Sequence, residues 1–302
     1  MIVNQHGLVR HIPEAVKREV RKRSKNGCVV CRSLVYDYEH IDPAFTDART
    51  HDPEKICLLC PGCHAEVTRG RLAKSQVTRA YERVQSENSV LPPFYHVALS
   101  GSLNLGLGNA TFQGLQPNAP VIEYDGASIL SVEYKHDQLF GCSRPSITGE
   151  IRNLTGEILV RLDDNRILLL ASGADVEMIG KRLRVTDSDA TTILQIVFDP
   201  PSAIIFDKLQ MKIGDLVCEL DSTFGVSYPT IDGSRARCLV DELRAVGARS
   251  AISYRSDNKK WETEGRLVID GRGFVLPMGG ARLATGAVQT YIPMIRYWPE
   301  AG

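Results

Sequence analysis

Residues 57–70 read CLLCPGCHAEVTRG, and the shorter stretch CVVC occupies residues 28–31. Each stretch contains a C-x-x-C pair, and together they supply four thiols: Cys28, Cys31, Cys60 and Cys63. Paired C-x-x-C motifs favour a metal over a disulfide in a reducing compartment, and four thiolates can close a tetrahedral Zn²⁺ site. The sequence therefore predicts a small unit held together by structural zinc, because so short a segment has little core of its own.

The segment around the two motifs predicts a strand, a loop, a second strand and a helix. SLVYDYEHI and the apolar run ICLL have strand composition, DPAFTDARTHDPEK is polar with turn signals, and Pro61 and Gly62 can open a helix. Cys57 lies inside the apolar run and is expected to be a buried, unliganded thiol. Further helices are expected at about 13–25 and over the periodic apolar positions of residues 72–84.

Composition limits the class of protein. The chain has 302 residues, of which 43% are hydrophobic and 24% are charged, as expected for a globular protein of about two domains. It shows neither an export signal nor an apolar run of membrane-spanning length, which predicts a soluble, non-exported, cytoplasmic protein. Residues 1–88 hold 15 Lys and Arg against 11 Asp and Glu, so the excess of positive charge lies in this part of the chain.

The order of these motifs resembles the HNH endonuclease family, which has a ββα-metal fold. The matching features are the first C-x-x-C, the acidic residue before His40 and Ile41, Pro43, and the run LLC-x-x-C-H. The resemblance covers about residues 10–75 and implies hydrolysis of DNA phosphodiesters with Mg²⁺ or Mn²⁺. It also implies that His40 is the general base, that Glu39 and His64 bind the catalytic cation, and that the four cysteines bind structural zinc.

The chemistry of the residues agrees with these implied roles. Phosphodiester cleavage needs a base with a pKa near neutrality and a cation that neutralises charge in the transition state. His40 can supply the base, and one carboxylate with one imidazole leaves open positions on a hard cation. Glu39 and His40 are neighbours on a predicted strand, so they point to opposite faces unless the strand end is distorted.

One position departs from the family pattern. Lys55 stands where the family has a middle Asn, and an ammonium group cannot accept a hydrogen bond from a histidine N–H. Either His51 takes the orienting role or Lys55 contacts the scissile phosphate. We favour His51, because a second imidazole can donate or accept a hydrogen bond. If neither substitution works, the domain binds DNA without cutting it.

Basic residues flank the zinc motifs on both sides. A run of charge is commonly a solvated helix face, but beside a nuclease-like motif it can also contact phosphates. The candidate nucleic-acid contacts are Lys17, Arg21, Lys22, Arg69 and Arg71.

We expect an α+β protein in which a zinc-stapled domain over residues 1–90 precedes a larger β-rich domain over 91–302. Short β-branched runs separated by Asp-Gly, Thr-Gly, Asp-Asn and Pro-Pro turns predict a sandwich- or barrel-like fold for the second domain. The apolar spacing of residues 234–248 predicts one helix there. No motif in this domain points to a chemistry, so recognition, sensing and regulation all remain open for it.

Two functions follow from the sequence. In the first, an HNH endonuclease is made selective or regulated by its β-rich domain through a ligand or protein partner, with a role in bacterial or phage defence suggested by analogy. Cutting both DNA strands would then require either a homodimer or two sequential nicks. In the alternative, the zinc unit is a catalytically inactive DNA-binding or assembly module and the β-rich domain is the working part.

Overall fold

A computed structural model describes the chain at residues 3–87, 91–108, 110–113, 118–137, 141–170, 174–187, 190–213, 216–221, 225–229, 235–238, 243–255 and 260–269. The described part is a strand-rich α+β protein with three α-helices. The elements are α1 (Glu14–Arg23), β1 (Asp37–His40), the 3₁₀ helix η1 (Pro53–Lys55), β2 (Ile56–Leu59), α2 (Pro61–Thr68), α3 (Lys74–Ser86), β3 (Phe94–His96), β4 (Asn104–Leu107), β5 (Ala110–Gln113), β6 (Ala119–Tyr124), β7 (Ala127–Asp137), β8 (Cys142–Arg152), β9 (Ile158–Asp163), β10 (Arg166–Leu169), β11 (Asp175–Ile179), β12 (Arg182–Thr186), β13 (Thr192–Asp199), β14 (Ala203–Ile213), β15 (Leu216–Asp221), β16 (Gly225–Pro229), β17 (Arg235–Cys238), β18 (Leu243–Arg255) and β19 (Lys260–Ile269). None of the helices in this part of the chain has the length and apolar character that a membrane span requires.

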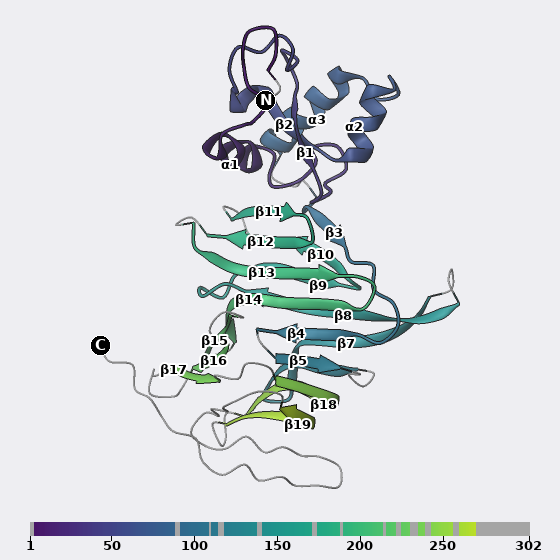
Figure 1. Ribbon diagram of the computed structural model, residues 1–302, viewed down its shortest axis with the longest axis vertical. Coiled ribbons are helices and arrows are strands. Elements are labelled where there is room, and N and C mark those ends of the chain that lie inside the picture. The colour runs from purple at the N-terminus through teal and green to yellow at the C-terminus, as the bar shows by residue number, and fades with distance from the viewer. Residues whose placement is uncertain are drawn as a thin grey trace. The chain divides into compact units, whose positions relative to one another are not determined.

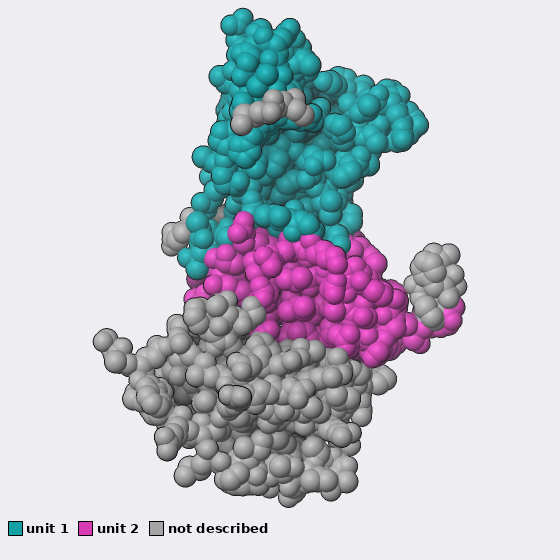
Figure 2. Space-filling view, viewed as in Figure 1, with its two compact units in different colours: residues 1–95, 168–180, 185–191 teal, residues 96–167, 181–184, 192–302 magenta. Residues whose placement is uncertain are grey.

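The chain forms two compact units, which Figure 2 colours separately. Unit 1 contains residues 1–95 together with 168–180 and 185–191, and unit 2 contains 96–167, 181–184 and 192–302. Unit 1 is therefore discontinuous in sequence, since it includes strand β11 from the middle of the chain. Its position in the sequence predicts that this strand belongs to the β-rich domain over 91–302.

Unit 1 contains the expected order of two strands and a helix (Figure 1). β1 pairs antiparallel with β2, and Glu39 lies opposite Cys57 while His40 lies opposite Ile56. α2 begins at Pro61, directly after β2, with Cys60 as its N-cap. The predictions of strands at SLVYDYEHI and ICLL and of a helix after Pro61 are confirmed.

Strand β2 is the centre of unit 1, because all four of its residues are buried. Ile56 and Leu58 pack with Val20 of α1, whereas Cys57 and Leu59 pack in a second cluster with Val77, Tyr81 and Val84 of α3. A strand covered on both faces needs a continuous apolar run rather than alternation, which explains ICLL. The predicted helices at 13–25 and 72–84 are observed as α1 and α3, with ends within two or three residues of those expected.

Unit 2 is a mainly antiparallel arrangement of strands. The antiparallel pairs include β6 with β7, β7 with β8, β8 with β9, and β13 with β14. Parallel pairings join β4 to β14 and both β5 and β6 to β18. The four predicted turn pairs lie between consecutive strands, namely Asp125-Gly126, Thr155-Gly156, Asp164-Asn165 and Pro200-Pro201. Asp164 and Asn165 both have positive φ, as a two-residue hairpin turn requires.

The predicted helix at residues 234–248 is wrong. The described residues of that stretch lie in β17 and the beginning of β18, and residues 234 and 239–242 lie outside the described chain. β17 pairs with β16, and β18 pairs with β19, β5 and β6. Pairing with strands distant in sequence overrides the helical spacing of apolar residues, because local propensity is a weak preference.

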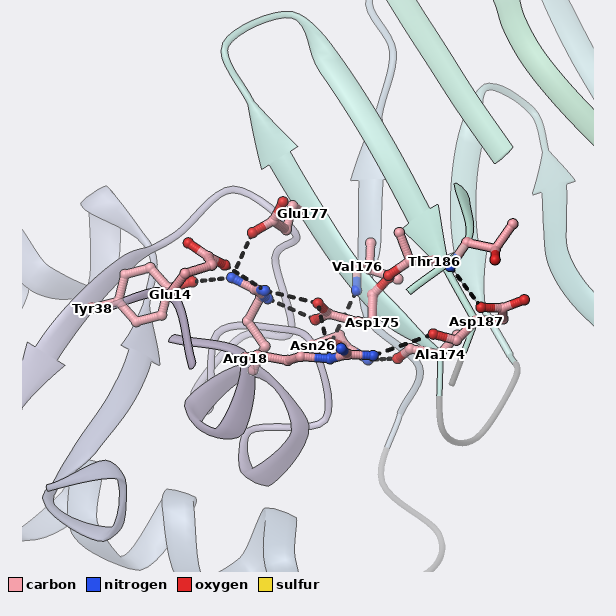
Figure 3. Close-up of polar contacts among 12 residues, drawn as sticks. Glu14, Arg18, Asn26, Tyr38, Ala174, Asp175, Val176, Glu177, Thr186 and Asp187 are labelled. Carbon is pink, nitrogen blue, oxygen red and sulfur yellow. Dashed lines mark hydrogen bonds and ion pairs between the residues drawn. The ribbon is translucent and has the colours of Figure 1, made fainter. Parts of the chain in front are cut away.

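A buried arginine, Arg21 of α1, pairs with Asp175 of β11 within unit 1. Figure 3 shows four of its partners, Glu14, Tyr38, Asp175 and Glu177. Arg21 is only 2% exposed, and its guanidinium donates to both carboxylate oxygens of Asp175 at 2.6 and 2.7 Å. It also contacts Glu177 at 2.6 Å, Glu14 at 2.9 Å and the Tyr38 hydroxyl at 2.8 Å. Burial lowers the pKa of Arg21, but the hydrogen bonds to Asp175 and Tyr38 outweigh burial and keep the pKa above its ordinary value.

Two further side chains attach β11 to the rest of unit 1. The Asn26 side chain donates to the Ala174 carbonyl at 2.7 Å and accepts from Val176 N–H at 3.3 Å. The Tyr36 hydroxyl donates to the Val176 carbonyl at 2.7 Å. These bonds attach backbone groups of Ala174 and Val176 to residues 26 and 36.

We expect Arg21→Met to lower the free energy of unfolding of unit 1 by about 3–5 kcal/mol, because it leaves the partly buried carboxylates of Asp175 and Glu177 without their shared cation. Urea unfolding of the full chain, followed by Tyr fluorescence, measures the change. Lys22→Met is the matched control on the exposed neighbouring position and should change stability little. A loss below about 1 kcal/mol in Arg21→Met would contradict the buried network.

Candidate functional site

The four motif cysteines converge in unit 1. The sulfur atoms of Cys28, Cys31, Cys60 and Cys63 all lie within 4.8 Å of one another. The Cys31 and Cys60 sulfurs are 3.5 Å apart. Four sulfurs at about 2.3 Å from a tetrahedral zinc would be about 3.8 Å apart, so the cluster has the donor set and size for a zinc ion.

The backbone around the cysteines supports this cluster. Cys60 is the N-cap of α2, and its sulfur accepts a hydrogen bond from Cys63 N–H at 3.3 Å. Arg32, which is 4% exposed, donates to the backbone carbonyls of Ser24, Lys25, Gly27, Cys28 and Leu91. Burial lowers the pKa of Arg32 to about 10, and the neighbouring thiolates of Cys28 and Cys31 oppose that shift. A guanidinium held in this position offsets the negative charge that four thiolates bring to a zinc site.

Cys57 is separate from the cluster. It is fully buried in the apolar core between β2 and α3. Burial, with the nearby charges of Glu39 and Cys28, raises the pKa of this thiol to about 12, so it stays neutral. This is the environment expected of an unliganded core cysteine.

Glu39 and His64 lie together. The Glu39 carboxylate oxygen Oε2 is 3.2 Å from His64 Nε2, which joins β1 to the first turns of α2. An octahedral Mg²⁺ with ligand distances of about 2.1 Å holds neighbouring ligand atoms about 3.0 Å apart. The separation therefore suits two adjacent ligands of one hard cation as well as a direct hydrogen bond.

His40 lies against His51. The His40 Nε2 and His51 Nδ1 atoms are 3.3 Å apart, and His51 Nε2 is 2.8 Å from the Val9 carbonyl oxygen. The Phe45 ring contacts His40 at a centroid distance of 5.4 Å and stacks on His51 at 6.3 Å with an 8° interplanar angle. His40 is only 7% exposed. Burial, with the charge of His51, lowers the pKa of His40, which favours the neutral form that a base needs.

These contacts assign the protons of the two rings when both are neutral. The Val9 carbonyl can only accept, so His51 carries its proton on Nε2 and presents the lone pair of Nδ1 to His40. His40 must then donate from Nε2. This leaves Nδ1 of His40 unprotonated and able to take a proton from a reactant.

The register of β1 and β2 places Glu39, the partner of His64, and His40, the partner of His51, on opposite faces of the sheet. Glu39 shares a face with Cys57 and Leu59, whereas His40 shares a face with Ile56 and Leu58. His40 is the last residue of β1. A phosphodiester that contacts both His40 and Glu39 must therefore lie across the end of the strand.

Of the two candidates for the missing Asn, His51 is the one bonded to His40 in the described chain. The Lys55 side chain is exposed, and the Lys55 carbonyl accepts from Ile41 N–H at 2.8 Å, extending the pairing of β1 and β2. The backbone of Lys55 thus takes part in strand pairing, and its ammonium group remains a candidate phosphate contact.

The candidate nucleic-acid contacts differ in the exposure of their side chains and in the ion pairs that they already make. Arg21 is buried in ion pairs and has no free face for a phosphate, so it is a structural residue rather than a DNA contact. Arg71 is exposed but makes a bidentate pair with Glu66 at 2.5 and 2.6 Å. Lys17 lies 3.7 Å from Glu14 and over the Tyr38 ring. Lys22 and Arg69 are exposed.

The N-terminal loop is a part of the site that no sequence motif predicts. Val9 supplies the carbonyl that holds His51, and Asn4 is bonded to the loop that carries Phe45. No sequence pattern marks a backbone carbonyl as a histidine partner, and the contacts join residues about forty positions apart. Only the folded chain brings them together.

Comparison with known proteins gives no match to a family model, to a curated protein or to a solved structure. The structure itself shows a cluster of four cysteines that could bind a metal ion.

We expect the purified chain to carry one zinc ion, which Cys60→Ser should remove because it deletes one of four ligands. Elemental analysis by mass spectrometry measures the metal. Cys57→Ala is the matched control and should retain zinc, as should His40→Ala. Zinc lost from Cys57→Ala, or retained at full stoichiometry by Cys60→Ser, would contradict the ligand assignment.

Proposed function

We propose that this protein is a metal-dependent endonuclease of the HNH type that hydrolyses DNA phosphodiester bonds. The observation that carries the proposal is a group of side chains in unit 1. Glu39 pairs with His64, and the neighbouring His40 is bonded to His51. Four cysteines of the same unit converge in one cluster. A zinc-binding module that only holds DNA needs the cysteines but has no use for this group of side chains. The resemblance of the motif order to HNH enzymes points to the same chemistry.

In the proposed reaction His40 is the general base. Its Nδ1 accepts a proton from a water molecule, while the Nε2 proton stays bonded to His51. His51 thereby takes the place of the Asn that the family has at position 55, and the Phe45 ring limits rotation of both imidazoles. His51 is a positioning residue, because it acts on the reaction through His40.

Glu39 and His64 would hold the catalytic cation, Mg²⁺ or Mn²⁺. One carboxylate and one imidazole fit a hard or borderline cation and leave positions for water and phosphate. When bound, the cation neutralises charge that develops on the phosphate. The proposed contacts with the DNA backbone are cations on the same unit, namely the exposed Lys22, Arg69 and Arg71 and the half-buried Lys17.

A catalytically inactive DNA-binding or assembly module is the alternative function. Two observations favour it: Lys55 replaces the family Asn, and His40 has little exposed surface for a substrate to reach. Under the alternative, the protein binds DNA without cutting it in any metal, and substitution of His40 leaves binding unchanged. The β-rich unit would then carry the activity.

The test is plasmid nicking by the full chain with Mg²⁺ or Mn²⁺, with EDTA as the metal-free control. His40→Ala should lower the nicking rate at least about 100-fold, the usual contribution of a general base. Glu39→Gln should abolish nicking at low Mg²⁺ and recover part of it at high Mg²⁺, because it weakens one cation ligand. His96→Ala, an exposed histidine of unit 2, is the matched control and should cut like the wild type.

The variant His51→Asn tests whether His51 orients His40 or only stabilises the folded chain. An Asn amide restores the family residue type and can bond to His40, so we expect His51→Asn to keep more activity than His51→Ala. Equal loss in both variants, with zinc retained, would show that His51 does not orient the base. A wild-type protein that binds DNA but does not cut it with either metal would contradict the nuclease proposal.

A further inference from the structure

The N-terminal loop of unit 1 folds back on itself before α1 begins. Val3 and Val9 form an antiparallel bridge, and Asn4 N–H donates to the Leu8 carbonyl at 3.0 Å. Gly7 closes the turn with φ of +76°, a conformation that favours glycine. The loop therefore has a defined shape that fixes where the Val9 carbonyl points.

The Asn4 side chain uses its full hydrogen-bonding capacity. Its Oδ1 accepts from His6 N–H at 3.0 Å and Leu8 N–H at 2.9 Å, which holds the loop closed. Its Nδ2 donates to the carbonyls of Phe45 and Ala48, both at 2.6 Å, which ties the loop to residues 43–51. An amide has two donors and two acceptor lone pairs, so all four are engaged. Asn4 thus connects the two loops with two buried-side donors, beside the exposed bond of Gln5 to Asp47 and the bond of His51 to Val9.

The same two loops carry both supports of the histidine pair. Phe45, whose carbonyl Asn4 holds, packs its ring against His40 and His51. Val9, which follows the Leu8 N–H bonded to Asn4, accepts the hydrogen bond of His51 Nε2. If the loops separate, His51 loses its acceptor and either of its nitrogens can carry the proton.

We propose that Asn4 is a positioning residue that sets the tautomers of His51 and His40 by locking the N-terminal loop onto residues 43–51. The inference rests on the proposed function, in which Nδ1 of His40 must be free of its proton. Asn4 itself touches neither imidazole and no reacting atom. Its effect passes through the Val9 carbonyl and the Phe45 ring.

The direct readout is long-range ¹H–¹⁵N correlation spectroscopy of the imidazole nitrogens in the full, zinc-loaded chain. Spectra recorded at about pH 8, above the ordinary imidazole pKa of about 6.5, report neutral rings. Signals are assigned with His40→Asn and His51→Asn. The wild type should show both rings protonated on Nε2 alone.

Three variants separate the possible roles of Asn4. Asn4→Ala removes all four bonds, whereas Asn4→Asp keeps the two acceptors inside the loop and removes both donors to residues 45 and 48. Both should show mixed or averaged tautomers at His51 and His40. Both should also cut DNA about 10- to 100-fold more slowly, the usual effect of losing a residue that orients a functional side chain. Gln5→Ala, which breaks only the exposed bond to Asp47, is the matched control and should behave as the wild type in both assays.

Wild-type tautomers in Asn4→Asp or Asn4→Ala would overturn the proposal. Loss of zinc and of the folded spectrum in both variants would overturn it too, because Asn4 would then act on global stability. Should the wild type fail to cut DNA, the proposed function falls, while the nitrogen spectra still decide the role of Asn4.

Discussion

The convergence of four cysteine sulfurs is the constraint on which unit 1 depends. It fixes the start of α2 against the turn at residues 28–31, and β1 and β2 lie between these two anchors. That arrangement brings His64, one residue beyond Cys63, to Glu39 on β1. A metal ion bound by these sulfurs would cross-link the unit and add to the packing around β2. The proposed reaction centre thus depends on the same convergence of cysteines that could bind a metal.

The second constraint is the buried Arg21. Its carboxylate partners Asp175 and Glu177 lie on β11, far along the chain, so unit 1 is complete only when that segment is present. A fragment ending near residue 90 would leave a buried guanidinium without its main counter-ions. The same guanidinium bonds to Tyr38, the neighbour of Glu39 on β1. The supporting contacts of the candidate site therefore extend into a segment that sequence order assigns to the β-rich region.

Local features could be predicted from the sequence, and features that depend on distant partners could not. Apolar runs and turn residues located β1, β2, α2, α3 and the hairpin turns of unit 2, because each is decided within a few residues. The helix predicted from the apolar spacing of residues 234–248 is wrong, because strand pairing overrides a local helical pattern. The sequence suggests Arg21 as a candidate DNA contact, because a helix rich in cations does not reveal which one faces inward. The role of Asn4 could not be predicted from the sequence, because it depends on hydrogen bonds to the distant residues Phe45 and Ala48.

The proposed chemistry requires a cation at Glu39 and His64, and anomalous X-ray diffraction can detect one directly. Crystals of the full chain grown with Mn²⁺ would be measured at the zinc and manganese absorption edges. We expect zinc among the sulfurs of Cys28, Cys31, Cys60 and Cys63, and manganese bound by the Glu39 carboxylate and the His64 imidazole. Zinc at the cysteines without manganese at Glu39 and His64, in saturating Mn²⁺, would contradict the assignment of a catalytic metal site and leave a structural zinc module.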